Sequence, residues 1–364
     1  MKKRLYVDFH VLQTVPPSCI NRDDTGSPKT AIYGGVTRAR VSSQAWKHAM
    51  RQAFVEESLL DEEDVGKRTK KVTELVEKEI AALAPEKDAA KLAKKTLDNA
   101  GIKNDEKGTK ALFFISQAQI KALAQLAVEE CADKKEYKKA LSTAPSADIA
   151  LFGRMVADDP SLNFDAAAQV AHSISTHAVQ NEYDYFTAVD DCQAEDNVGA
   201  GHLGTVEYNS ATLYRYATVN VMELERHLGA EKAAEVVRSF GEAFIRSMPT
   251  GKQNTFANRT LPDAVYVTIR EDQPVNLCGA FERAVRKSAE GYAEPSKSAL
   301  QAYAQQLYQS FAETPAESFT VGTGLEALAP AQPLNTMLDA LEEAVKENLL
   351  SLIHISEPTR HSLI

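Results

Sequence analysis

The sequence predicts an α+β fold, in which helices pack on one face of an antiparallel sheet. Apolar and polar residues alternate over residues 3–12, as they do in a half-buried strand. A helical pattern at 44–54 follows, and a β-prone segment at 211–221 comes much later. A helix at 230–248 and a strand at 264–269 complete a core that is like the order β-α-β-β-α-β. This order is typical of a ferredoxin-like or RRM-like core, here interrupted by large insertions.

Composition places the chain among ordinary globular proteins. Its 364 residues allow roughly two domains and a substantial core, with 44% hydrophobic and 25% charged residues. No apolar run of about 18 residues predicts a membrane span, and Asp8 interrupts the basic N-terminus too early for a signal peptide. We therefore expect a cytoplasmic protein without cofactor or metal. Its cysteines have no metal or redox spacing and suit reduced thiols: Cys19, Cys131, Cys192 and Cys278.

Positive charge is concentrated in residues 25–55, which contain no Asp or Glu. The whole chain has a net charge of −10, and this segment has five Lys and Arg, so the rest has −10 − 5 = −15. An acidic protein that gathers uncontested cations in one segment is expected to bind an anion there. In the extended segment around Arg38 and Arg40, the two side chains should leave the same face.

The helix predicted at 44–54 has two faces. Ser42 and Ser43 supply N-caps, and an apolar stripe including Trp46 and Met50 is expected to be buried. A second stripe, spaced i, i+3, i+4 and i+7, consists of Gln44, Lys47, His48 and Arg51. Capped N–H groups, the helix dipole and Lys47 would form a phosphate site. The alternative is an ordinary solvated basic face.

Two insertions separate the predicted core segments. Residues 56–139 are rich in Ala, Lys, Glu and Leu with a helical period, and a further helix is expected at 115–131. After a break at 146–159, we expect a helix at 165–178. Residues 183–189 and 202–209 are β-prone arms around a Gly-rich polar segment, which predicts a long exposed hairpin.

The C-terminal segment is excluded from the fold. Residues 350–360 resemble the in-frame translation of a sequencing adapter, so 350–364 is interpreted as a cloning or assembly scar rather than a native tail. The histidines suggest no metal site either. His172 and His177 are five residues apart, which is unsuitable for helical ligation, and we expect both to be packing residues.

Several motifs together resemble one family, the CasC-type backbone subunit of the type I-E CRISPR–Cas Cascade surveillance complex. The resemblance spans roughly residues 4–349, in order, and is weakest at 56–139. Its motifs are residues 17–24, 33–35, 38–44, 153–155, 185–191, 202–205 and 251–253.

The resemblance implies a hand-shaped protein whose copies polymerise along one guide RNA. The division would be 1–55 palm, 56–178 helical fingers, 179–210 thumb hairpin, and 211–349 second palm part with C-terminal helices. Met155 would wedge beside a kinked base step, and the thumb would cover RNA held by a neighbouring copy. The RNA-binding residues implied are Asn21, Arg22, Lys29, Arg38, Arg40, Ser42, Gln44, Lys47, Arg51, Met155, Tyr185, Phe186, Thr187, His202, Lys252 and Gln253.

Two observations bear on the RNA contacts that the resemblance implies. Val36-Thr37 replaces positions that are often basic in relatives, so the palm is expected to make fewer phosphate contacts. From the residues alone, Met155 and Phe186 are also compatible with plain core packing. The residue types nevertheless suit a guide of any sequence, because phosphate contacts and base stacking do not depend on base identity.

The implied partners are CRISPR guide RNA, target DNA paired with the guide, further copies of the chain and other Cascade subunits, with no membrane. We expect no catalysis. The alternative is a metal-dependent ribonuclease using one of the acidic pairs, although no His or Lys is spaced as an obvious general base. Those pairs are Asp23-Asp24, Asp158-Asp159 and Asp190-Asp191.

Overall fold

The computed structural model describes residues 4–105, 108–156, 158–188 and 202–354. Its main sheet is antiparallel, with the order β13-β12-β1-β11-β9-β3-β2, and β8 and β10 also pair with β11. The bounds of these strands are β1 Tyr6–Ser18, β2 Thr30–Tyr33, β3 Val36–Val41, β8 Ala168–Val170, β9 Ser173–Ser175, β10 Glu182–Ala188, β11 His202–Asn220, β12 Ala264–Arg270 and β13 Glu317–Gly322.

The centre of the sheet has the predicted ferredoxin-like order. β1 lies between β11 and β12, so Tyr6 faces Asn220 on one side and Arg270 on the other. Helix α1 (Ser43–Glu56) lies in sequence between β1 and β9, and α8 (Ala230–Arg246) lies between β11 and β12. The four strands β12-β1-β11-β9 with these two crossovers form the split β-α-β arrangement. The predicted α+β class and the helix and strand near 230–248 and 264–269 are thereby confirmed.

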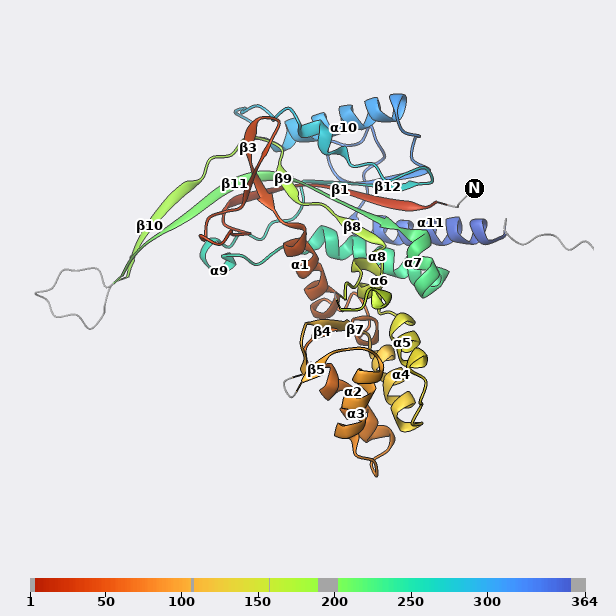
Figure 1. Cartoon of the computed structure of the whole chain (residues 1–364). Helices are drawn as coiled ribbons and strands as arrows, with labels where there is room; N and C mark the ends of the chain where they lie inside the picture. Colours follow the sequence, from red (N-terminus) through yellow and green to blue (C-terminus); the bar gives the residue numbers. More distant parts are fainter. Residues whose placement is uncertain (1–3, 106–107, 157, 189–201, 355–364) are drawn as a thin grey trace, which may run out of the picture.

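Helices cover both faces of the sheet rather than one (Figure 1). On one face, Leu5, Val7 and Phe9 pack with α1, α7 (Val221–Leu228), α8 and α11 (Leu334–His354). On the other face, Leu12 packs with α10 (Ala293–Ser310) and the 3₁₀ turn Leu277–Phe281. The prediction of a half-buried first strand was therefore wrong. The alternation identified the apolar face of β1 correctly, but α10 covers the polar residues that alternate with the apolar ones.

Those polar residues form a buried network under α10. Asp8 accepts hydrogen bonds from the Tyr216 hydroxyl at 3.0 Å and the Val275 N–H at 2.8 Å. His10 Nδ1 lies 2.8 Å from the Tyr214 hydroxyl. Burial raises the pKa of Asp8 from 3.8 to about 6, and burial lowers the pKa of His10 from 6.5 to about 3. Both side chains are therefore favoured in their neutral forms.

These shifts predict opposite pH dependences of stability. Between about pH 4 and 6 the folded state keeps the Asp8 proton that the unfolded chain has lost, so Asp8 makes stability fall as pH rises. Over the same interval the unfolded chain holds the His10 proton that the folded state excludes, so His10 makes stability rise with pH. Each slope should be about 1 kcal/mol per pH unit, and in the wild type the two nearly cancel.

Single substitutions should separate the two slopes. In His10→Gln, the free energy of unfolding should fall between pH 4 and 6, and in Asp8→Asn it should rise. Urea denaturation followed by circular dichroism at half-unit pH steps measures both. Equal slopes in the two variants would show that these groups do not titrate differently in the folded and unfolded chains.

A helical unit with its own core projects from the α8 side of the sheet (Figure 1). It contains α2 Val72–Leu83, α3 Ala89–Asn99, α4 Gln117–Val128 and α5 Lys134–Ser142, with the short strand pairs β4 Lys67–Thr69 with β7 Phe113–Ile115 and β5 Asn104–Asp105 with β6 Gly108–Thr109. The helix predicted at 115–131 is confirmed with shorter bounds. Helix α6 (Ala147–Phe152) returns the chain to the sheet.

The helix predicted at 165–178 was wrong. This segment forms β8 and β9, which pair with β11 in the main sheet. Val170 and Ile174 are buried there, and β-branched side chains pack well on a pleated surface. The segment forms strands because it pairs with residues of β11 more than 35 positions later in the chain, and local periodicity cannot detect such partners.

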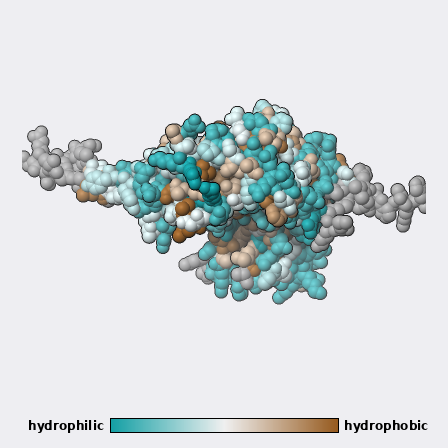
Figure 2. Space-filling view, turned by 90° about the horizontal axis from the view of Figure 1, so that it is seen from above, coloured by the Kyte–Doolittle hydropathy of each residue, from teal (hydrophilic) through white to brown (hydrophobic). Residues whose placement is uncertain are grey.

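The predicted hairpin is confirmed as a ribbon of β10 and the first part of β11, paired from Glu182↔Tyr208 to Ala188↔His202. It projects well beyond the body in both views (Figures 1 and 2). The predicted turn at 189–201 lies outside the described residues, as does the end of the tail from 355. None of the described helices is long and apolar enough to span a membrane.

Candidate nucleic-acid interface

The site is organised around the N-terminus of α1. The Ser42 hydroxyl accepts a hydrogen bond from the Ala45 N–H, as the predicted N-cap requires. The backbone N–H of Ser42 donates to Asn21 Oδ1 at 2.9 Å, which ties the loop containing Arg22 to the start of the helix. Trp46 and Met50 are buried in the main core, as predicted. The opposite face of α1 is left at the surface.

On that face, the predicted stripe meets Met155 across a pocket of about 290 Å³. Gln44 and His48 are exposed and Lys47 is half-buried, with its Nζ 5.7 Å from the centre of the Phe152 ring. Desolvation lowers the pKa of Lys47. Residues about 110 positions apart in sequence thus line one pocket, which carries both a cation and apolar surface. Such a pocket suits a phosphate beside a base.

The turn that presents Met155 is held rigidly. Gly153 has φ 75°, and a Cβ there would lie 2.8 Å from the Phe164 carbonyl oxygen, so only glycine fits. Arg154 is buried and donates hydrogen bonds to the carbonyl oxygens of Leu162 and Leu141, each at 2.8 Å. Met155 is consequently 85% exposed, and plain core packing is excluded for it.

Lys29 and Arg40 form a second group beside the helix N-terminus. The Arg40 N–H donates to the Lys29 carbonyl oxygen, and Arg40 Nη1 lies 3.3 Å from His172 Nδ1. His172 is exposed, and desolvation together with Arg40 and Lys29 lowers its pKa. The interpretation of His172 as a packing residue was therefore wrong. It was correct for His177, which is buried and accepts the Thr212 N–H.

Arg38 does not belong to this surface. Its side chain is fully buried, and it donates to the carbonyl oxygens of Tyr33, Ser175 and Phe281 at 2.8–3.1 Å. All of these partners are backbone groups, so Arg38 fastens the β2–β3 turn to the body. The expectation that both Arg38 and Arg40 contact RNA is therefore contradicted for Arg38, which is not available to a phosphate.

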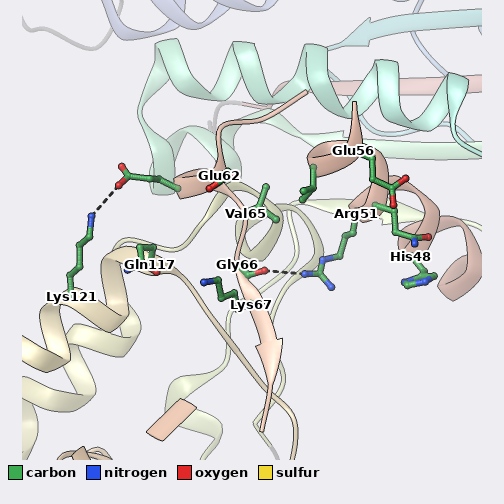
Figure 3. Close-up of a pocket in the computed structure, with 12 residues that line it drawn as sticks. His48, Arg51, Glu56, Glu62, Val65, Gly66, Lys67, Gln117 and Lys121 are labelled. Carbon is green, nitrogen blue, oxygen red and sulfur yellow. Dashed lines mark hydrogen bonds and ion pairs between the residues drawn. The ribbon is translucent and has the colours of Figure 1, made fainter. Parts of the chain in front are cut away.

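Arg51 is also engaged inside the protein, although it lies on the predicted stripe. Its Nε lies 3.0 Å from Oδ2 of buried Asp148. Its Nη2 donates to the Gly66 carbonyl oxygen at 3.1 Å (Figure 3). Its guanidinium lies 4.5 Å from the centre of the Phe114 ring. It separates the Met155 pocket from a larger one of about 720 Å³ between α1 and the helical unit. Arg51 therefore mainly holds α1 and the helical unit together.

The loop at 251–253 closes the other side of the site. A Cβ at Gly251 would lie 1.9 Å from the Ile20 carbonyl oxygen, so this glycine permits direct contact with the backbone next to Arg22. Lys252 has φ 52°. Burial raises the pKa of the Cys19 thiol, and the charges of Arg22 and Lys252 oppose that shift. Both cations therefore lie near this thiol. Gln253 begins the short helix α9 (Gln253–Phe256).

The cations of this surface lack acidic partners. Some cations elsewhere in the protein pair with carboxylates within 4.0 Å, for example Lys87 with Glu130, and others, such as Lys94 and Lys95 on α3, do not. At this site, none of the following cations pairs with a described carboxylate: Arg22, Lys29, Arg40, Lys47 and Lys252. We call these five the basic surface. Charges left uncompensated in one area indicate an anionic partner.

The hairpin carries its residues on two faces. Tyr185 and Thr187 leave one face of β10, and Phe186 leaves the other, because side chains alternate along a strand. Tyr185 is 64% exposed and Phe186 41% exposed. The Phe186 ring lies over Gly204 of the paired strand, where a Cβ would come within 2.3 Å of the ring. Neither aromatic belongs to the main core. The backbone of His202 pairs with Ala188.

Two further residues at the site went unpredicted. The cation Arg68 of β4 lines the Met155 pocket, and His172, whose lowered pKa favours the neutral imidazole, lies beside Lys29 and Arg40. Arg68 lies inside the segment that composition described as a neutral helical insertion. No sequence signal distinguishes it from the other exposed cations there.

The acidic pairs are used locally. Asp23 accepts hydrogen bonds from the N–H groups of Thr25 and Ser27 within its own loop. Asp159 caps a 3₁₀ turn and pairs with Lys138 at 2.7 Å. Asp190 and Asp191 lie outside the described residues. Among the residues that the structure describes, no group of three or more His, Cys, Asp or Glu could hold a metal ion.

The family model described as "CT1975-like protein" matches residues 7–347. The chain belongs to the CT1975-like family. This CT1975-like chain is also similar to a chain of the solved structure "CRISPR RNA-guided surveillance complex, pre-nicking", with 32% identity and a TM-score of 0.77 over 93% of this chain and 100% of the other. A chain of "CRISPR RNA-guided surveillance complex" has 31% identity and a TM-score of 0.63 over 93% and 99%. No curated protein matches the sequence.

Proposed function

We propose that this CT1975-like protein is a guide-RNA-binding backbone subunit of a CRISPR surveillance complex. The observation that carries the proposal is the basic surface, which lies beside the exposed Met155 on a chain similar over its length to chains of such complexes. The contacts available there are cations, hydroxyls, an amide and apolar side chains. They hold a backbone and stack on bases without reading them, so any guide sequence can be accepted.

The finer features of the proposal concern assembly. Several copies line up along one RNA strand, and the hairpin of each copy reaches over RNA held by its neighbour. The exposed aromatic residues on an arm that projects from the body support this arrangement. We further propose membership of a type I-E Cascade in the cytoplasm, with target DNA bound by pairing to the guide and other Cascade subunits at the ends of the row.

The protein is proposed to be a scaffold without catalysis. Asp23 and Asp159, two members of the acidic pairs, stabilise local turns, which supports this reading over the ribonuclease alternative. Co-expression with a CRISPR array, followed by purification and sizing of the bound RNA, tests the class. A discrete guide-length RNA that stays bound and intact in EDTA is expected. RNA of random length, or cleavage that the chelator stops, would contradict the proposal.

Phe186→Ala should weaken binding only where copies meet. One copy on a short oligonucleotide should bind nearly as well as wild type, because the hairpin then covers no neighbour's RNA. On a guide that holds several copies, a cost of about 1 kcal/mol or more should recur at every junction. Fluorescence anisotropy on short and long RNAs measures both. Tyr183→Ala, on the same exposed strand nearer the body, is the control. Equal weakening on short and long RNA would place Phe186 in its own copy's site.

A further inference from the structure

One aromatic side chain is exposed far from the basic surface and the hairpin. Phe311, directly after α10, is 83% exposed. Its backbone N–H donates to the Leu307 carbonyl oxygen at 2.8 Å. Arg270 Nη2 donates to the Glu313 carbonyl oxygen at 2.8 Å, and the Glu313 N–H donates to Asp272 at 3.2 Å. The backbone is therefore held at Phe311 and again at Glu313, and Phe311 projects from a fixed turn.

An apolar groove of about 520 Å³ lies on the other face of the sheet, between α8, α11 and the strands β12 and β13. Leu261 at its rim is 72% exposed. Its apolar lining comprises Ile245, Leu261, Pro262, Val265, Val321 and Leu334. Glu57, Arg246 and Arg259 also line it. Arg259 pairs with Glu57 at 3.4 Å, both side chains being at the surface, and Arg246 pairs with Glu242 at 3.2 Å.

The ring and the groove lie at opposite ends of the same two strands. The groove is at the Val265–Val321 end, whereas the turn after Phe311 enters β13 beside Ile269. At about 3.4 Å per residue, Val265 and Arg270 are separated by roughly 17 Å along the strand. The two features also face opposite sides, since α10 and α11 cover different faces (Figure 1). Phe311 therefore cannot fill the groove of its own chain.

Two different patches at opposite ends of a molecule are what a head-to-tail row of identical copies needs. Contacts of this type form rings or open helical rows, whereas a twofold dimer would use one patch twice. Aromatic anchors in apolar pockets also dominate the energetics of protein interfaces. The Glu313 carboxylate, which forms no ion pair within the described residues, would replace the exposed Glu57 as the partner of Arg259.

We propose that Phe311 of one copy inserts into the groove at Leu261 of the next copy, with Glu313 beside Arg259. The contact rests on the proposed row of copies along RNA and adds a protein–protein joint to it. It lies on surfaces other than the basic surface and the hairpin, so it makes adjacent copies bind cooperatively without touching RNA.

Phe311→Ser tests the contact on RNA. Binding to an oligonucleotide that holds one copy should be unchanged, and the cooperativity between copies on a longer RNA should fall at least tenfold. Leu83→Ser, an exposed apolar residue at the end of α2, is the control and should change neither. Unchanged cooperativity in Phe311→Ser would overturn the contact while leaving the proposed RNA binding intact.

Charge exchange gives a stricter test. Arg259→Glu and Glu313→Arg should each reduce cooperativity. The double variant should recover it, because every junction then carries the reversed pair. If the double variant is as weak as the worse single variant, the pairing is wrong.

Sedimentation velocity without RNA separates this contact from the proposed function. At high concentration, wild type should self-associate weakly and Phe311→Ser should remain monomeric. A wild type that binds no RNA but associates through Phe311 would overturn the function and support the contact. Identical sedimentation of both proteins over the full concentration range would count against the contact.

Discussion

Reversing two charges of the basic surface, Lys29→Glu with Lys47→Glu, should abolish tight binding of single-stranded RNA without unfolding the protein. Lys29 and Lys47 form no ion pair within the described chain, so their replacement breaks no internal contact with a carboxylate. Each phosphate contact with a single strand contributes about 0.7 to the slope of log affinity against log salt. The slope should therefore fall by about 1.4, and by the same amount for RNAs of unrelated sequence.

The matched control is Lys94→Glu with Lys95→Glu. These exposed lysines lie on α3, away from the basic surface, and their replacement changes the net charge by the same amount. Fluorescence anisotropy between 50 and 300 mM salt, on the order of physiological ionic strength, measures affinity and slope together. Thermal melting confirms that all proteins are folded. If both double variants lose the same affinity, overall charge rather than this surface binds the RNA.

The sequence predicted those features that local chemistry determines. The cap at Ser42, the buried stripe with Trp46 and the exposed face of α1 follow from helical period and capping alone. The hairpin follows from two β-prone arms around a Gly-rich segment. In these segments the period of the apolar residues and the tertiary packing agree.

The predictions that were wrong failed because the deciding contacts come from residues far away in the sequence. Arg38 is buried because carbonyl groups of Ser175 and Phe281 surround it, 137 and 243 residues away. The strands β8 and β9 exist because β11 offers them an edge. A count of acids and bases in a segment cannot show which cations are already satisfied. Residues 25–55 therefore contain Lys29, Arg40 and Lys47 of the basic surface, but also Arg38 and Arg51, which serve the fold.

Arg51 should consequently matter for stability far more than Lys47 does. The Asp148 carboxylate is fully buried and receives hydrogen bonds from Arg51, from the Gly66 N–H at 2.8 Å and from the Ser146 hydroxyl at 2.6 Å. Burial already raises the pKa of Asp148, against the opposing effect of Arg51. Arg51→Ala removes the only cation that pairs with it among the described residues. Leaving a buried charge without its partner costs about 3–5 kcal/mol.

The pH dependence of the stability loss shows whether the unpaired Asp148 carboxylate causes it. Without Arg51 the pKa of Asp148 should rise further, so the folded state retains a proton that the unfolded chain loses above its ordinary value of 3.8. The loss of stability in Arg51→Ala should therefore be largest near pH 7 and smallest near pH 3, where the carboxyl is protonated in both states. Urea denaturation at the two pH values measures the difference.

Two variants make the experiment decisive. Arg51→Ala with Asp148→Asn should recover part of the stability at pH 7, because the unpaired charge is gone. Lys47→Ala should melt like wild type but bind RNA less tightly, since its ammonium group has no acidic partner within the described residues and lies only near the Phe152 ring. If Arg51→Ala instead keeps the wild-type unfolding free energy and loses as much RNA affinity as Lys47→Ala, then Arg51 leaves Asp148 to bind phosphate, and its role in holding α1 and the helical unit together is wrong.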